Sequence, residues 1–451
     1  MSTSHTTGRR HYYRDILSIG IPIIIGQLGT IVLGFADTLM IGHYGTAELA
    51  AAGLVNNIFA LVLISYLGFS YGLTPIVGRL YGMGHKLEIG PKLRSSIAAN
   101  IIVGAAMVAL LTVLYFNLHR IGQPEELLPL IRPYFIVNLL SVIFVGVFNT
   151  LKQLFDGITH TRVAMWVMVG GNVVNIFFNW MLIYGVGVFP EMGLLGAGVS
   201  TLGSRVLMAL ALVLVLACGK RYALYREALS HARILRADMA EMFRMGLPLA
   251  LQLGMESAAF SLSCIMVGWL GTIPLAAHQV TVTVSQLFYL VLSGMASAMA
   301  IRVSHFVGLA DWGAVRTNAA DGFRIVLLIS MSMAVVALIF RHHIGMLFTD
   351  SGEVCGIVGT LIIALAVYQF GDGLQYTYAN ALRGIACVKP LVPYAFIAYF
   401  VINLPLGYLL GFTFGFGIYG IWTAFPFGLT TAGLLFRRRF LKELDQLEAR
   451  G

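Results

Sequence analysis

The sequence predicts an all-α, polytopic membrane protein with twelve transmembrane helices, on the evidence of its composition, its apolar segments and an internal repeat. Of its 451 residues, 58% are hydrophobic and only 11% are Asp, Glu, Lys or Arg, whereas a soluble domain is about 25% charged. A water-soluble fold could not bury so much apolar surface, which excludes a cytosolic enzyme, a nucleic-acid-binding module and a disordered scaffold. A spanning helix needs about 20 apolar residues, so twelve spans leave no room for a soluble domain.

Apolar segments separated by short connectors fill the chain. They cover residues 16–41, 47–75, 95–118, 134–155, 163–185, 194–218, 246–270, 273–301, 319–340, 354–381, 391–411 and 418–436. The longest polar linker lies near the middle of the chain and carries six basic residues. We therefore expect four parts: an N-terminal six-helix lobe at 1–218, a cytoplasmic linker at 219–245, a C-terminal six-helix lobe at 246–436 and a cytoplasmic tail at 437–451.

The distribution of Lys and Arg predicts the orientation in the membrane. If the N-terminus lies in the cytoplasm, twenty-five Lys and Arg residues fall on the cytoplasmic side and three, Arg120, Arg132 and Arg341, fall outside. Cytoplasmic loops collect Lys and Arg, so both termini are expected in the cytoplasm. The same rule explains the net charge of +9 without a nucleic-acid partner. No cleavable signal peptide is expected, because the first apolar stretch is too long for one.

An internal repeat relates the two halves of the chain. A shift of 226 residues places Gly20 and Pro22 on Gly246 and Pro248. A fainter echo pairs FDGITHTR at 155–162 with LRGIACVK at 382–389. The same 226-residue shift places Met40, Gly42, Gly45, Thr46, Leu49, Ala50 and Ala51 on Met266, Gly268, Gly271, Thr272, Leu275, Ala276 and Ala277. Six spans per half is an even number, so the halves enter the membrane in the same direction and are related by a pseudo-twofold axis along the membrane normal.

Seventeen of the twenty acidic residues lie in loops, tails or at the ends of the expected spans, and three lie within spans: Asp37, Glu256 and Asp372. A carboxylate in hydrocarbon costs at least about 2.5–3.5 kcal/mol, so each is expected to face a polar cavity and to take a cation or a proton. The alternative is a structural ion pair. Only Arg205 lies within a span away from its ends, and one arginine cannot neutralise three acids.

Polar residues at helical spacing surround these acids. Gln252 shares a helix face with Glu256, and the asparagines 172, 175 and 179 form one stripe that belongs with Asp37. A third stripe consists of Tyr368, Asp372, Gln375 and Tyr376. Oxygen ligands without His or Cys suit hard cations or protons. For the Asn stripe alone, hydrogen bonding between helices is an equal alternative. The four scattered cysteines contain no CxxC pair and indicate neither a metal site nor a disulfide framework.

Four features of the sequence are typical of one family of membrane proteins: FADTLMIGHYG at 35–45, the GIP and GLP openings of the first and seventh spans, Glu256, and YQFGDGLQYTYANALRG at 368–384. On these features the whole chain resembles the multidrug and toxic compound extrusion (MATE) family, in particular its NorM-type branch. The FDGITHTR segment departs from the family's more usual Gln-Gly-x-Gly pattern. The family implies a two-lobed bacterial inner-membrane antiporter that expels cationic, amphipathic drugs in exchange for sodium ions or protons.

The resemblance also implies roles for single residues. Glu256, Asp372, Tyr368 and Tyr289 match the cation site of the C-terminal lobe, where the two acids would hold a monovalent cation. Asp37, Asn175, Asn179 and, more weakly, Thr201 match a polar pocket in the N-terminal lobe, and Asp37 takes part in coupling. We expect no catalytic residue and no cofactor, only sodium or a proton as coupling ion, and a lipid-embedded monomer.

Other classes of membrane protein fit the sequence less well. A lipid-linked oligosaccharide flippase of the same superfamily is the main alternative, but it should carry several basic residues within its spans to bind pyrophosphate, and only Arg205 lies there. A membrane-embedded enzyme should show clustered motifs such as Asp-x-x-Asp or paired histidines, and the single pair, His342–His343, lies at the edge of a loop. A channel is disfavoured because two pseudo-symmetric halves suit rocking rather than a symmetric pore.

Overall fold

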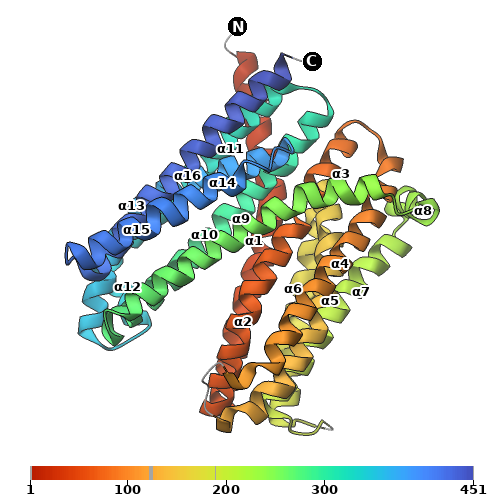
Figure 1. Cartoon of the computed structure of the whole chain (residues 1–451). Coiled ribbons are helices and arrows are strands. Elements are labelled where there is room, and N and C mark those ends of the chain that lie inside the picture. The colour runs from red at the N-terminus through yellow and green to blue at the C-terminus, as the bar shows by residue number, and fades with distance from the viewer. Residues whose placement is uncertain (1–2, 121–124, 188, 450–451) are drawn as a thin grey trace. The chain divides into compact units, whose positions relative to one another are not determined.

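The computed structural model of the chain describes residues 3–120, 125–187 and 189–449. In this part of the chain all regular structure is helical, with no strand (Figure 1). Twelve helical stretches among the described residues are long and apolar enough to cross a membrane. The predicted all-α, twelve-span fold class is therefore confirmed. Residues 1–2 of the predicted N-terminal lobe and residues 450–451 of the predicted tail lie outside the described residues.

The helices follow the predicted segments in order. Their bounds are α1 Thr3–Tyr44, α2 Thr46–Ser70, α3 Leu73–Gly82, α4 Ile89–Phe116, α5 Leu128–Gly157, α6 Thr161–Tyr184, α7 Gly193–Cys218, α8 Ala223–His231, α9 Arg236–Gly268, α10 Thr272–Gly308, α11 Trp312–Ile339, α12 Arg341–Ile344, α13 Gly352–Gly384, α14 Leu391–Phe396, α15 Leu404–Tyr408 and α16 Gly417–Glu448. Short 3₁₀ turns are η1 Lys86–Glu88, η2 Leu118–Arg120, η3 Glu125–Leu127, η4 Lys220–Tyr222 and η5 Gly345–Leu347. Two π-helical segments, η6 Ile397–Asn403 and η7 Leu409–Thr413, lie in the eleventh span.

The chain forms two compact units. The N-unit is Ile25–Ala250, and the C-unit is Met1–Ile24 together with Leu251–Gly451. Helix α5 is central to the N-unit, where it packs against α2, α4 and α7, and α13 is central to the C-unit, where it packs against α10, α11 and α16. The beginning of α1 thus belongs with the C-terminal half of the sequence, and the beginning of α9 with the N-terminal half. The lobe boundaries given above remain a prediction from sequence.

The glycines of the repeat make equivalent contacts in both units. A Cβ atom on Gly246 of α9 would lie 2.6 Å from the carbonyl oxygen of Phe69 in α2. A Cβ atom on Gly20 of α1 would lie 2.7 Å from the sulfur of Met295 in α10. Residues 69 and 295 are separated by the same 226 positions as residues 20 and 246. The repeat therefore encodes a close helix crossing at which glycine is needed for space.

A second pair of glycines extends the correspondence to the fainter part of the repeat. A Cβ atom on Gly157, at the end of α5, would lie 2.7 Å from Cγ1 of Val77. A Cβ atom on Gly384, at the end of α13, would lie 2.7 Å from Cγ1 of Val303. Val77 and Val303 are again 226 residues apart. The echo between FDGITHTR and LRGIACVK therefore reflects a shared packing position.

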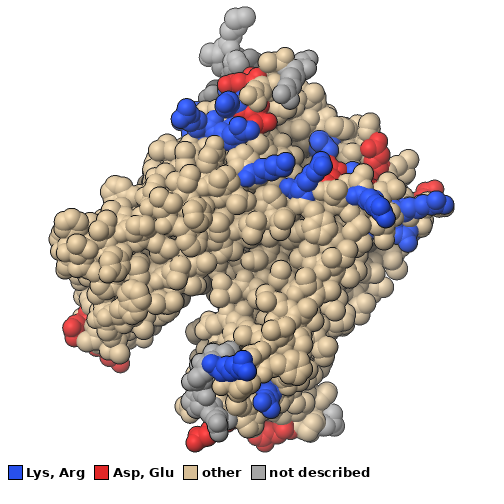
Figure 2. All heavy atoms as spheres, viewed as in Figure 1, with Lys and Arg blue, Asp and Glu red and all other residues tan. Residues whose placement is uncertain are grey.

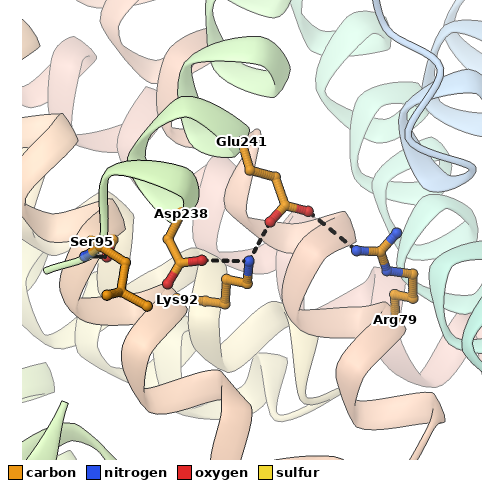
Figure 3. A network of polar contacts seen from close by, with 6 residues as sticks. Arg79, Lys92, Ser95, Asp238 and Glu241 are labelled. Carbon is orange, nitrogen blue, oxygen red and sulfur yellow. Dashed lines mark hydrogen bonds and ion pairs between the residues drawn. The ribbon is translucent and has the colours of Figure 1, made fainter. Parts of the chain in front are cut away.

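Ion pairs fix the segment that leads into α9 (Figure 3). The Lys92 ammonium lies 2.7 Å from a carboxylate oxygen of Asp238 and 2.5 Å from one of Glu241. The Arg79 guanidinium lies 3.2 Å from the other Glu241 oxygen, and the Leu235 N–H donates to the Ser95 hydroxyl at 3.3 Å. The polar linker is thus a docked structure, built from η4, α8 and the first turns of α9, rather than a free tether.

Two helices, α9 and α16, continue beyond the predicted apolar spans into segments rich in charged residues. Helix α9 begins at Arg236, before the predicted start at 246, and α16 continues to Glu448, beyond the predicted end at 436. In the extension of α16, Arg439 pairs with Glu443 one turn later at 2.7 Å, a spacing that supports helices in water. Lys and Arg gather in the N-unit around α3 and α8 and in the C-unit near the end of α16, while the middle of the visible face shows neither sign of charge (Figure 2).

Candidate functional site

The central helix of the C-unit carries a continuous polar face. At about 100° per residue, Tyr368, Gln369, Asp372, Gln375 and Tyr376 lie within an arc of about 120° on α13. All five side chains are buried, and Asp372 is only 3% exposed. Since α13 packs against α10, α11 and α16, this face is directed into the bundle rather than into lipid. The stripe predicted from sequence is therefore an internal feature of the unit.

Glu256 of α9 is held at this face by several donors. It is 7% exposed. The Tyr376 hydroxyl donates to one carboxylate oxygen, and the Gln252 amide donates to the other at 3.3 Å. Tyr399 and Gln375 also hydrogen-bond to it. A carboxylate that accepts this many hydrogen bonds is stabilised in its charged form.

Asp372 lies close enough to Glu256 for the two carboxylates to interact electrostatically. Tyr368, one turn earlier on α13, interacts with Asp372 in the same way and shares a hydrogen bond with the Ser285 hydroxyl of α10. Tyr289 of α10 packs edge-on against Tyr376, with ring centroids 5.0 Å apart. The structure thus brings together all four residues assigned by resemblance to this site.

Within the described residues, no basic side chain is paired with either of these two acids. Neither Glu256 nor Asp372 forms an ion pair with a Lys, Arg or His in the described part of the chain. That part also contains no group of three His, Cys, Asp or Glu side chains that could hold a metal ion. Two buried carboxylates with no base beside them require a proton or an exchangeable cation for charge compensation.

The N-unit contains a second polar cluster, around Asp37 of α1. The Asn179 amide of α6 donates to an Asp37 carboxylate oxygen. Asp37 is partly exposed, whereas Asn179 is fully buried. Asn172 is buried two turns earlier on α6, where its amide nitrogen would lie 2.9 Å from a Cβ atom on Gly29 of α1. The predicted association between Asp37 and the Asn stripe is therefore present in the structure.

The middle residue of the stripe connects α6 to α7. The Asn175 amide donates to the Ser204 hydroxyl at 2.9 Å and to the Thr201 hydroxyl at 3.4 Å. The Ser200 hydroxyl donates to the Asn175 carbonyl at 2.8 Å. These bonds match the alternative of interhelical hydrogen bonding for this one position. Asn179 differs, because its amide contacts an acid.

Arg205 of α7 is a basic residue near this cluster. Its guanidinium donates to the Ser141 hydroxyl of α5 at 2.5 Å and interacts with Asp37 over a longer distance. No ion pair within 4.0 Å joins Arg205 to Asp37 among the described residues. Asp37 therefore interacts electrostatically with Arg205 without forming an ion pair with it.

Sequence reasoning missed four polar partners: Tyr399, Ser285, Ser204 and Ser141. A single serine or tyrosine in an apolar span carries no periodic signal, which explains three of them. Ser204 lies three residues after Thr201 and shares its helix face, so helical spacing could have indicated it.

Comparisons with known proteins agree with this architecture. The family model described as MatE matches residues 22–181 and 248–409, one match in each half of the chain. The chain is 29% identical over 440 residues to the multidrug resistance protein NorM of Photobacterium profundum, covering 95% of each chain. It is 30% identical over 432 residues to the probable multidrug resistance protein NorM of Xanthomonas campestris pv. campestris, covering 96% of this chain and 94% of the relative.

Solved structures support the fold. A MATE structure in a straight conformation matches with a TM-score of 0.89 at 20% sequence identity, covering 97% of each chain. A mutant of the Vibrio cholerae MATE transporter VcmN matches with a TM-score of 0.86 at 17% identity, covering 98% of each chain. At these identities the likeness concerns the fold alone.

Proposed function

This chain belongs to the MatE family, and from that premise we propose that it is a secondary active multidrug exporter. It exchanges cationic, amphipathic compounds for sodium ions or protons by alternating access. The observation that supports this best is the buried pair Glu256 and Asp372, which has no fixed base beside it among the residues that the structure describes. The relatives are named as multidrug resistance proteins, which supports a drug as the second ligand.

The proposed mechanism is competition for one buried negative charge. A sodium ion or proton and a cationic drug each neutralise the same carboxylates, so only one of them is bound at a time. Moving one elementary charge across 100 mV is worth about 2.3 kcal/mol. A one-for-one exchange of monovalent cations moves no net charge, so the concentration gradient of the ion must drive export.

Roles for the remaining residues follow from the same proposal. Tyr368 and Tyr289 line the coupling site in the C-unit. Asp37, Asn175, Asn179 and Thr201 form the polar pocket of the N-terminal lobe, and Asp37 contributes a further coupling carboxylate in addition to Glu256 and Asp372. We also propose that the protein acts as a monomer in the bacterial inner membrane, with both termini in the cytoplasm.

The test is efflux of ethidium from cells that express the protein, with external sodium and pH varied independently. Expression is expected to speed efflux, and raising external sodium or lowering external pH is expected to speed it further. Efflux that equals that of cells without the protein under every condition would contradict the proposed function. A voltage-clamped vesicle assay should show little dependence on membrane potential at fixed ion gradients.

A further inference from the structure

The linker between the two halves of the sequence is docked at the ends of two membrane spans. Helix α8 packs against α4 and α7, and both of these are candidate spans. A Cβ atom on Gly90, in the first turn of α4, would lie 2.4 Å from the carbonyl carbon of Ala228 in α8. The Arg94 guanidinium donates to the carbonyl oxygen of Ala232 at 2.7 Å. The linker is therefore held at the level where α4 begins and α7 ends.

The exposed side of this linker is strongly basic. Between the end of α7 and the first residue of α9, five Lys and Arg residues are exposed and one acid, Glu227, is present. Lys and Arg side chains are visible around α8 in Figure 2. Arg79 and Lys92 of the same unit pair with acids, whereas none of the five linker residues has an ion-pair partner in the part of the chain that the structure describes. The five are Lys220, Arg221, Arg226, Arg233 and Arg236.

Apolar side chains are exposed among these charges. Leu224 is 40% exposed, Ile234 54% and Leu235 49%, whereas Tyr222 and Tyr225 are buried. A segment that carries Lys and Arg together with exposed Leu and Ile, next to the ends of spans, has the composition of a membrane-interface element. At such an interface the acyl chains cover the apolar groups and the lipid phosphates neutralise the basic ones.

We propose that this surface binds anionic phospholipids of the adjacent leaflet. We call it the α8 patch, formed by the five basic and three apolar residues named above. The guanidinium groups donate to the lipid phosphate, and Leu224, Ile234 and Leu235 enter the acyl region. A zwitterionic lipid also has a phosphate but no net charge, so the excess of basic residues selects anionic lipids. This inference goes beyond the exchange function proposed above and does not depend on it.

The α8 patch is preformed, because several contacts fix the linker on the N-unit. The Tyr222 hydroxyl shares a hydrogen bond of 3.1 Å with Nδ1 of His160. The Tyr222 ring also packs edge-on against Phe155, with centroids 5.2 Å apart. The Arg226 guanidinium donates to the carbonyl oxygen of Ala217, in the last turn of α7. A site that is ordered before binding loses little conformational entropy when the ligand arrives, and a ligand that binds the folded state stabilises it.

The test is native mass spectrometry of the full-length protein in detergent, titrated separately with phosphatidylglycerol and phosphatidylcholine. Wild type is expected to bind the anionic phosphatidylglycerol at least about tenfold more tightly. Each basic residue near an anionic surface contributes a factor of about five. The variant Arg221→Gln/Arg233→Gln/Arg236→Gln is therefore expected to lose this preference. The side chains of these three residues make no hydrogen bond within the described structure, so the docking of α8 is kept.

The matched control removes the same amount of charge from another basic segment. It is Arg437→Gln/Arg438→Gln/Lys442→Gln, three exposed residues of α16 in the C-unit, and it is expected to keep the wild-type preference. Phosphatidylglycerol is also expected to raise the melting temperature of wild type and of this control, and to raise that of the linker variant much less.

A further arm separates a lipid from a soluble phosphate. Glycerol phosphate carries the headgroup charge without acyl chains, and an excess of it is expected to leave bound phosphatidylglycerol in place. The variant Leu224→Ser/Ile234→Ser/Leu235→Ser is expected to bind phosphatidylglycerol several-fold more weakly, because its acyl chains lose their apolar contacts.

Two results would overturn the proposal. The first is equal affinity for phosphatidylglycerol in the linker variant and in the α16 control. The second is complete displacement of phosphatidylglycerol by glycerol phosphate, which would make the patch a site for soluble anions. If the triple linker variant melts below wild type without lipid, the single variants Arg221→Gln and Arg233→Gln decide, each with an expected loss of about fivefold. None of these measurements uses efflux, so failure of the exchange function leaves the lipid site standing, and the reverse also holds.

Discussion

Replacing Glu256 with Gln is expected to lower the initial rate of ethidium efflux at least about tenfold, and Asp372→Asn is expected to do the same. Both substitutions keep the size of the side chain and remove its charge. A hydrogen bond to a charged group is worth about 1.5–3 kcal/mol, which corresponds to a factor of ten or more in rate. Without the charge, the drug and the coupling ion no longer compete for one site.

The matched control for these variants is Glu353→Gln. Glu353 is an exposed acid in the first turn of α13, so it tests loss of a carboxylate on the same helix outside the buried pocket. Its efflux rate is expected to equal that of wild type. Near-normal efflux in both Glu256→Gln and Asp372→Asn, at normal expression, would remove these acids from the mechanism.

A large loss of stability is expected for Gly246→Ala. The added Cβ atom would lie 2.6 Å from the Phe69 carbonyl oxygen and 2.7 Å from its ring, and the backbone of α2 cannot move aside easily. Overpacking of this kind typically costs about 1–3 kcal/mol. The measurement is the apparent melting temperature in detergent, followed by size-exclusion chromatography of heated samples, and it is expected to fall by several degrees.

Two other glycines serve as comparisons for Gly246. Gly170→Ala adds a Cβ atom with nothing within 4 Å and is expected to leave the melting temperature unchanged or slightly raised, because Ala favours helix. Gly20→Ala meets mainly the sulfur of Met295, a flexible group, so its loss should be smaller than that of Gly246→Ala. Equal melting temperatures for the alanine variants at positions 246 and 170 would contradict the close crossing of α9 and α2.

The fold class and the three acidic residues within the spans could be predicted from the sequence alone. Twelve apolar segments can hardly form anything other than spans, and a carboxylate at position 256 or 372 stands out because hydrocarbon penalises it. Helical spacing then groups Gln252 with Glu256 and Gln375 with Asp372. These are local patterns, and local patterns are readable from a single sequence.

Features that depend on contacts between distant segments could not be predicted. The packing of Gly246 on Phe69 joins two spans that are about 177 positions apart, and no periodicity encodes it. Tyr399 appears in sequence as one of several aromatic residues in an apolar span, and its hydrogen bond with Gln375 joins the eleventh span to α13. The Ser141 partner of Arg205 is likewise visible only when α5 and α7 are placed side by side.

The most direct test of the account is whether a drug displaces the bound cation. Purified protein is loaded with ²²Na⁺ in weakly buffered solution and titrated with ethidium, while released sodium, released protons and bound ethidium are measured together. Competition for the buried carboxylates predicts that about one cation leaves for each ethidium bound, and that Glu256→Gln and Asp372→Asn release none. Ethidium that binds to saturation while the cation stays bound would contradict the account.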